Sequence, residues 1–138
     1  MHERLHVVIP PTSYSEAIET AKLIDNDEKF PFLKGVESIH KNDPVMNYLA
    51  ETWYPALTIC GLDGIPSVQD AGNVIRSKIS LMLSVRTPPT LKCQEASDWL
   101  CKELERDPPY NAKIAAKPLE SGSGWNKKEE TERFSNIV

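Results

Sequence analysis

The feature that most constrains the fold of this chain is a pair of strand-like segments between Trp53 and Pro89, separated by a loop that contains several glycines. In the second segment, aliphatic residues occupy every other position, and a period of two places them on one face of a strand. The aliphatic positions are Ile79, Leu81, Leu83 and Val85, and the alternate positions are Lys78, Ser80, Met82, Ser84 and Arg86. The two segments bracket a turn loop that ends in Ala71-Gly72-Asn73.

Helical patterns precede these strands. Ser13 and Glu16 have the spacing of a capping box, which predicts a helix over about residues 14–24. Pro44 precedes a second, shorter helical stretch that runs through Leu49. The chain therefore combines helical with strand-like patterns.

A third helix is predicted after the second strand, from an N-cap at Thr90 to about Arg106. Its apolar stripe should lie on the apolar face of the sheet. Two weaker extended segments, residues 5–9 and residues 112–116, complete the predicted elements. The last part of the chain, from residue 117 onward, is polar and contains a Gly/Ser-rich segment, which predicts a loop followed by a loosely held tail.

Two polar residues near the strands are candidates for a binding site. Arg86 ends the second strand on its polar face, where a guanidinium can bind a carboxylate through two parallel hydrogen bonds. The alternative is an arginine that is simply solvated at the end of a strand. Asn73 lies in the loop, directly after Gly72, and its alternative is a turn residue that tolerates left-handed backbone.

Several blocks of sequence carry a family resemblance. The main blocks are Pro55-Ala-Leu-Thr-Ile, Ala71-Gly-Asn-Val-Ile-Arg and Leu83-Ser-Val-Arg-Thr-Pro-Pro-Thr90. They resemble the lid, or dimerisation, domain of the zinc-dependent metallopeptidase family that includes aminoacylase, carnosine dipeptidase, acetylornithine deacetylase and succinyl-diaminopimelate desuccinylase. Flanking blocks are similar to one peptidase branch of that family: Lys29-Phe-Pro-Phe-Leu-Lys-Gly35, Asp107-Pro-Pro-Tyr-Asn-Ala-Lys113 and Ser123-Gly-Trp-Asn126. The resemblance covers roughly residues 5 to 126.

The resemblance implies a two-layer α+β sandwich of the ferredoxin-like kind, with an antiparallel sheet and helices on one face. The first strand and first helix of that fold precede the matched region, so the expected organisation is a partial lid over residues 1–126 and a polar tail over residues 127–138. The family's lids also imply a homodimer, formed by pairing of edge strands or helices between subunits. The catalytic domain of the same enzyme is the second implied partner.

The family's chemistry gives roles to the two candidate residues. The position matching Asn73 reaches an active site, commonly that of the partner subunit, where its amide would bind the developing oxyanion. The position matching Arg86 binds the carboxylate of the substrate. In these enzymes a metal-bound water attacks an amide or peptide carbonyl, and two zinc ions are held in a separate catalytic domain.

No zinc ligands are expected in this chain. Its three histidines, His2, His6 and His40, are far apart in the sequence and have no matching carboxylate cluster. The family's His-x-Asp motif does not occur, and the pair Glu129-Glu130 lies in a polar run typical of a solvated tail. The chain alone is therefore predicted to be inactive, with zinc belonging to the parent family's catalytic domain.

Length and charge exclude several functional classes. A chain of 138 residues can form one domain with a core but is short for a two-domain enzyme. The net charge of −4, with dispersed lysines and arginines, argues against a nucleic-acid partner. No apolar run is long enough to span a membrane and no secretory signal begins the chain, so a cytoplasmic location is expected. The three cysteines, an odd number, are expected to be reduced and to act as small buried apolar residues.

Two other functions remain open at this point. The chain could be a freestanding, non-catalytic α+β module that binds a small acid or a protein partner. It could also be a folded remnant without activity. The composition does not separate these alternatives from a lid of a hydrolase.

Overall fold

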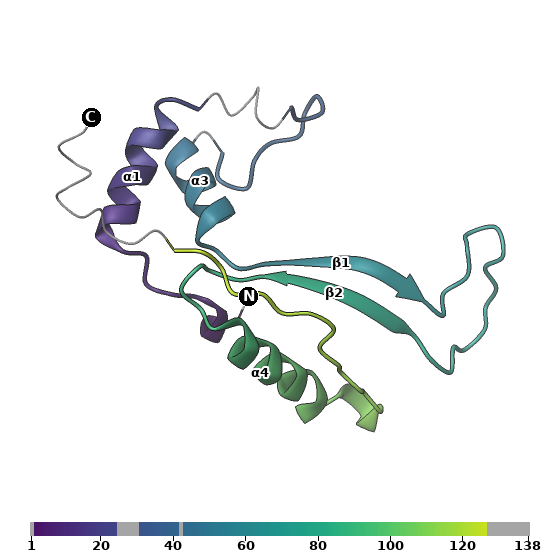
Figure 1. Cartoon of the computed structure of the whole chain (residues 1–138). Coiled ribbons are helices and arrows are strands. Elements are labelled where there is room, and N and C mark those ends of the chain that lie inside the picture. Colours follow the sequence, from purple (N-terminus) through teal and green to yellow (C-terminus); the bar gives the residue numbers. More distant parts are fainter. Residues whose placement is uncertain (1, 25–30, 42, 127–138) are drawn as a thin grey trace.

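The computed structural model describes residues 2–24, 31–41 and 43–126. Its elements are a 3-10 turn (Glu3–Leu5), α1 (Pro11–Ala21), α3 (Pro44–Thr52), β1 (Ala56–Asp63), β2 (Ser80–Arg86), α4 (Cys93–Arg106) and a second 3-10 turn (Pro109–Asn111) (Figure 1). The predicted α+β class is confirmed. The polar tail predicted over residues 127–138 lies outside the described residues.

Strands β1 and β2 form a two-stranded antiparallel ribbon, as predicted. Ala56 pairs with Arg86 at one end, and Asp63 pairs with Ser80 at the other. The register shifts between Ile59 and Gly61, so Cys60 is an extra residue in a β-bulge. The same residue is exposed, which contradicts the expectation that all three cysteines are buried. All three are free thiols, as predicted.

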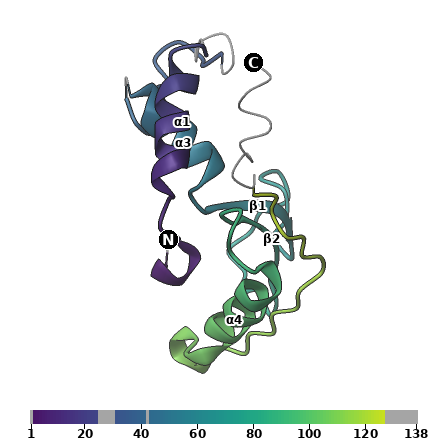
Figure 2. The ribbon, with the colours of Figure 1, turned by 60° about the vertical axis from the view of Figure 1, so that its left-hand side comes forward.

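The most buried part of the protein lies between α1 and α3, which sit side by side in both views of the ribbon (Figures 1 and 2). Ala17 and Leu49 are almost fully buried there, and Trp53, which follows α3, is 7% exposed. Pro44 begins α3, as predicted, and the Asp43 carboxylate caps this helix by accepting a hydrogen bond from the Met46 N–H (2.9 Å). This core positions Trp53 at the junction of the helices and the ribbon.

The predicted starts of two helices were wrong. Helix α1 begins at Pro11, because a proline at the first helical position has its φ already fixed and lacks the N–H that would need a cap. Ser13 is therefore inside the helix and caps nothing. The N-cap of α4 is Lys92 rather than Thr90, and it provides no side-chain cap. Instead, Lys92 pairs with Glu95 in the first turn (2.8 Å), and this contact raises the pKa of Lys92.

Neither of the weaker predicted strands forms. Leu5 closes the first 3-10 turn, and Val7 and Ile9 pack against the helical core instead of joining the sheet. In the segment 112–116, the backbone N–H of Ala116 donates to the Glu105 carboxylate (2.7 Å) rather than to a strand. This segment therefore returns along α4 through side-chain contacts.

Helix α4 lies along one side of the ribbon (Figures 1 and 2). It follows the predicted bounds closely but buries none of its residues. The expectation that its stripe covers the apolar face of the sheet is only partly met, because Leu57 and Leu81 on that face remain 53% exposed. Among the described residues no helix has the length and hydrophobicity to cross a bilayer.

The loop between the strands, residues 64–79, projects with the end of the ribbon away from the helices (Figure 1). Its first residue, Gly64, has a φ of +87°, and a Cβ there would lie 2.4 Å from the carbonyl oxygen of Lys78. Only glycine fits this close approach without moving the backbone. Gly64 thus closes the ribbon at the end that carries Asn73.

Candidate functional site

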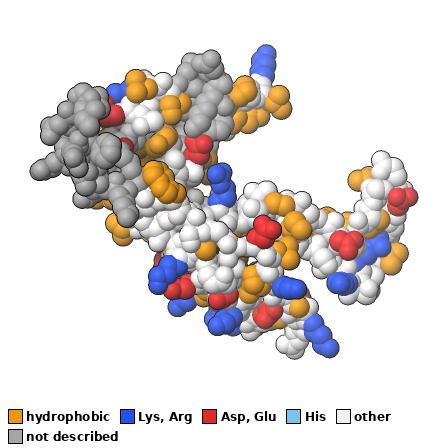
Figure 3. Space-filling model, in the orientation of Figure 1, with side chains coloured by type: hydrophobic (Ala, Val, Ile, Leu, Met, Phe, Trp, Pro, Cys, Tyr) orange, Lys and Arg blue, Asp and Glu red, His pale blue; other side chains and the backbone are white. Residues whose placement is uncertain are grey.

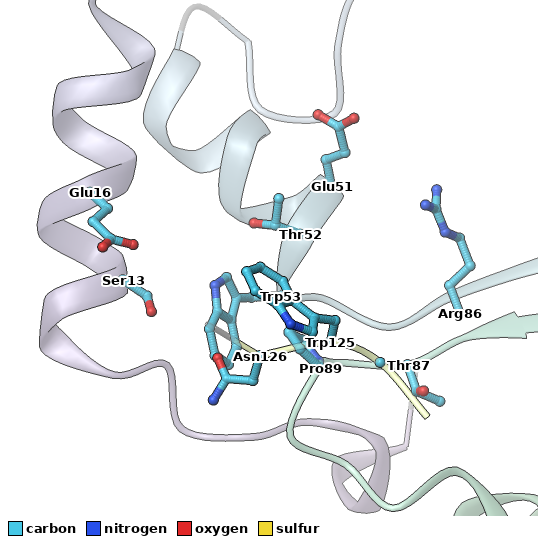
Figure 4. A pocket seen from close by; sticks show the side chains of 11 residues that line it. Ser13, Glu16, Glu51, Thr52, Trp53, Arg86, Thr87, Pro89, Trp125 and Asn126 are labelled. Atoms are coloured by element: carbon cyan, nitrogen blue, oxygen red, sulfur yellow. The ribbon is translucent and has the colours of Figure 1, made fainter. Parts of the chain in front are cut away.

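An open cleft of about 430 Å³ lies where the ribbon meets the helical core. Residues that come from distant parts of the sequence line it, among them Thr52, Trp53, Arg86, Thr87, Trp125 and Asn126. Figure 4 shows these side chains between α1, α3 and the end of β2. One of the two residues predicted from the sequence, Arg86, is therefore part of a concave site.

The strand register explains the position of Arg86. It pairs with Ala56, and α3 ends at Thr52, so the end of β2 is held next to the end of α3. Directly after Arg86, Thr87 lines the cleft and Pro88 is one of the largest fully buried side chains. This burial anchors the turn that follows β2. The arginine is thus carried by backbone that is fixed on both sides.

The opposite wall of the cleft is formed where the backbone at Gly124 crosses the backbone at Pro89. A Cβ on Gly124 would lie only 2.7 Å from the Cα of Pro89, so this approach requires glycine. The segment that precedes the crossing is tethered to the start of α4. Its contacts are Ser121 Oγ donating to Gln94 (3.0 Å) and Ser123 Oγ lying 3.4 Å from Cys93 Sγ. The next residue, Trp125, is 81% exposed and lines the cleft.

The cleft contains charges of both signs. Glu16 of α1 and Glu51 of α3 line it together with Arg86 (Figure 4). Both glutamates make polar contacts. Arg86 is exposed and has no hydrogen bond or ion pair with another described residue. Its five N–H donors are consequently open to a ligand.

Asn73 lies at the other end of the ribbon, in the loop that joins the strands. The seven residues of β2 span about 20 Å at roughly 3.3 Å per residue, so Asn73 and Arg86 do not meet within one chain. Among the described residues, the only non-glycine residues with positive φ are Tyr110 and Asn111. Asn73 is therefore not left-handed, but it is a turn residue: the Val74 N–H donates to the Gly72 carbonyl (2.8 Å) across it, and its side chain is exposed.

The resemblance places the two zinc ions in a separate domain, and the three histidines of this chain make other contacts. His2 Nδ1 accepts a hydrogen bond from the Arg4 N–H (3.2 Å), and its ring lies 4.7 Å from that of Trp99. The rings of His6 and His40 lie 6.4 and 6.2 Å from Tyr54. Within the part of the chain that the structure describes, no three His, Cys, Asp or Glu side chains are grouped to hold a metal.

Sequence reasoning missed the contribution of Trp125 to the cleft. The run around it was interpreted as a loop leading into a loosely held tail, because glycine and serine dominate it. The available signal was Gly124, because glycine permits a close approach of two backbone segments. Away from the cleft, acidic and basic side chains are interspersed over the face seen in Figure 3.

No protein-family model and no curated protein matches this chain. The resemblance to metallopeptidase lids therefore rests on the sequence blocks themselves. Its consequences for function are proposals.

Proposed function

We propose that this chain is the dimerisation and lid domain of a zinc-dependent peptidase or amidohydrolase that cleaves an amide or peptide bond next to a carboxylate. The single observation that carries this proposal is the position of Arg86, which enters a concave site with no competing partner among the described residues. A guanidinium in that setting binds a carboxylate in a defined orientation through paired hydrogen bonds. The catalytic metals belong to a domain outside this chain.

The separation of Arg86 and Asn73 supports a lid that works across a dimer. The two residues lie at opposite ends of one ribbon, so a single chain cannot place both on one small substrate. In a homodimer, the projecting loop of one subunit would carry Asn73 to the site of the other, where its amide would bind the developing oxyanion. The role of Arg86 is then ground-state positioning, and that of Asn73 is stabilisation of the transition state.

The alternative function, a freestanding module that binds a small acid without catalysis, is favoured by the same cleft because Arg86 needs no second domain to bind an acid. Sequencing the native transcript on both sides of this reading frame separates the two. In-frame His-x-Asp and Glu-Glu segments upstream would support the hydrolase. Stop codons that isolate residues 1–138 would overturn it and leave the binding module.

Replacing Arg86 by lysine tests the carboxylate site directly. Lysine keeps the charge but loses the two-pronged geometry, so binding of N-acetylglycine should weaken by about 1–3 kcal/mol. The measurement is an NMR titration of the whole chain with N-acetylglycine and with its uncharged amide. Arg76→Lys, in the exposed loop, is the matched control and should bind as the unmodified chain does. Equal binding by both variants would contradict the assignment of Arg86.

A further inference from the structure

Two tryptophans line the same cleft as Arg86, and the proposed function does not use either of them. They differ in environment: Trp53 is 7% exposed and fixed in the core, whereas Trp125 is 81% exposed. Large aromatic side chains bury much apolar area when they find a partner, so an open indole at the wall of a cleft is a surface on which a ligand can pack.

Neighbouring contacts hold the backbone at Trp125 in place, although its indole ring is exposed. The Gly124–Pro89 crossing precedes it directly, and Ser121 and Ser123 tether the same segment to α4. Because these contacts hold the backbone, little conformational freedom has to be lost when a ligand packs against the ring. Figure 4 places the indole between Trp53 and the end of β2 that carries Arg86.

We propose that this cleft selects carboxylates whose neighbouring side chain is aromatic, such as the C-terminal residue of a peptide or an acylated aromatic amino acid. The carboxylate binds Arg86 and the aromatic ring packs on Trp125, with Trp53 as the buried floor of the cleft. Aromatic rings prefer offset or edge-to-face contact with an indole, which adds specificity to simple apolar burial. This inference rests on the proposed function, because it takes Arg86 as the carboxylate site.

The test is an NMR titration of the whole chain that follows the indole N–H signals of its three tryptophans. The probes are N-acetylphenylalanine, N-acetylalanine and N-acetylphenylalanine amide. We expect N-acetylphenylalanine to bind about tenfold more tightly than N-acetylalanine. Its addition should shift the signals of Trp53 and Trp125 and leave that of Trp99, which packs on His2, unchanged.

Two variants test whether Trp125 causes the preference for the aromatic acid. Trp125→Leu should reduce the preference for phenylalanine over alanine to about twofold, while both acids still bind. Trp99→Phe is the matched control and should keep the full preference. Because Trp125 is mostly exposed, its replacement should leave the fold intact, which circular dichroism checks.

The outcomes separate this inference from the proposed function. Equal affinity for the two acids, or a preference that survives Trp125→Leu, would overturn the aromatic selectivity and leave the carboxylate site standing. Equal affinity for N-acetylphenylalanine and its amide would instead count against Arg86 as the carboxylate site. Absence of any binding would overturn both.

Discussion

Replacing Leu49 with alanine is expected to lower the free energy of unfolding by about 2–5 kcal/mol. Leu49 is 1% exposed, is among the largest fully buried side chains, and belongs to the cluster between α1 and α3. Its truncation removes apolar burial and leaves a cavity against Ala17, a residue too small to fill it. Domains of this size are stable by only about 5–15 kcal/mol, so the loss is a large fraction of the total.

The same change should also disturb the cleft. Trp53 belongs to the Leu49 cluster and lines the cleft with Arg86, so the core and the site share a side chain. Urea unfolding followed by tryptophan fluorescence measures the stability. Leu23→Ala is the matched control, because Leu23 is 87% exposed and its truncation should cost less than about 0.5 kcal/mol. A loss below about 1 kcal/mol for Leu49→Ala would show that this cluster is not the core.

Elements with a strong local pattern could be predicted from the sequence. The period-two alternation identified β2, and helical spacing identified α1 and α4, because side-chain burial follows directly from these periods. The signal for α3 was mixed and rested on the proline that precedes it. The cap residues were less informative. Ser13 has the right chemistry for an N-cap, but the prolines before it had already started the helix.

The bulge in β1 is visible in the sequence as a break in the two-residue spacing of the aliphatic side chains. Leu57 and Ile59 are two positions apart, but the next aliphatic residue of the strand, Leu62, is three positions further on. The extra residue, Cys60, restores the phase, so that all three pair with aliphatic residues of β2. A change of spacing from two to three within a strand is therefore a usable signal for a bulge.

The site could be predicted only in part. The position of Arg86 at the end of a strand follows from local alternation, so the residue was identified correctly as exposed on the polar face. The wall formed by Trp125 depends on the crossing of Gly124 with Pro89, which lie far apart in the sequence. Local periodicity contains no information on such a contact. The extended segments at 5–9 and 112–116 failed for the same reason, because strands need partners that pattern alone does not provide.

We propose that the exposed apolar face of the ribbon is where a second copy of this chain would bind. Cross-strand pairing places six aliphatic side chains on one face, since paired residues share a side. They are Leu57, Ile59, Leu62, Leu81, Leu83 and Val85. Four of these are more than half exposed, and no charged residue of the ribbon lies on this face. Helix α4 covers this face only in part, so the four exposed side chains still lack a second layer.

A twofold contact between identical ribbons provides that layer. In an isologous dimer the same patch packs against itself, which suits a face that is uniformly aliphatic. The loop with Asn73 projects beyond the strands, away from the helices, and would lie outside such a contact (Figure 1).

Replacing Ile59 with aspartate should convert the proposed dimer to a monomer. The twofold axis would bury two new carboxylates without partners, and each costs several kcal/mol, so we expect the dissociation constant to rise by at least about 100-fold. Thr58→Asp is the matched control, because Thr58 neighbours Ile59 but pairs with Ser84 on the opposite face. Sedimentation equilibrium over a range of concentrations measures both. A monomeric unmodified chain, or equal dissociation by Thr58→Asp, would exclude this face as the dimer contact.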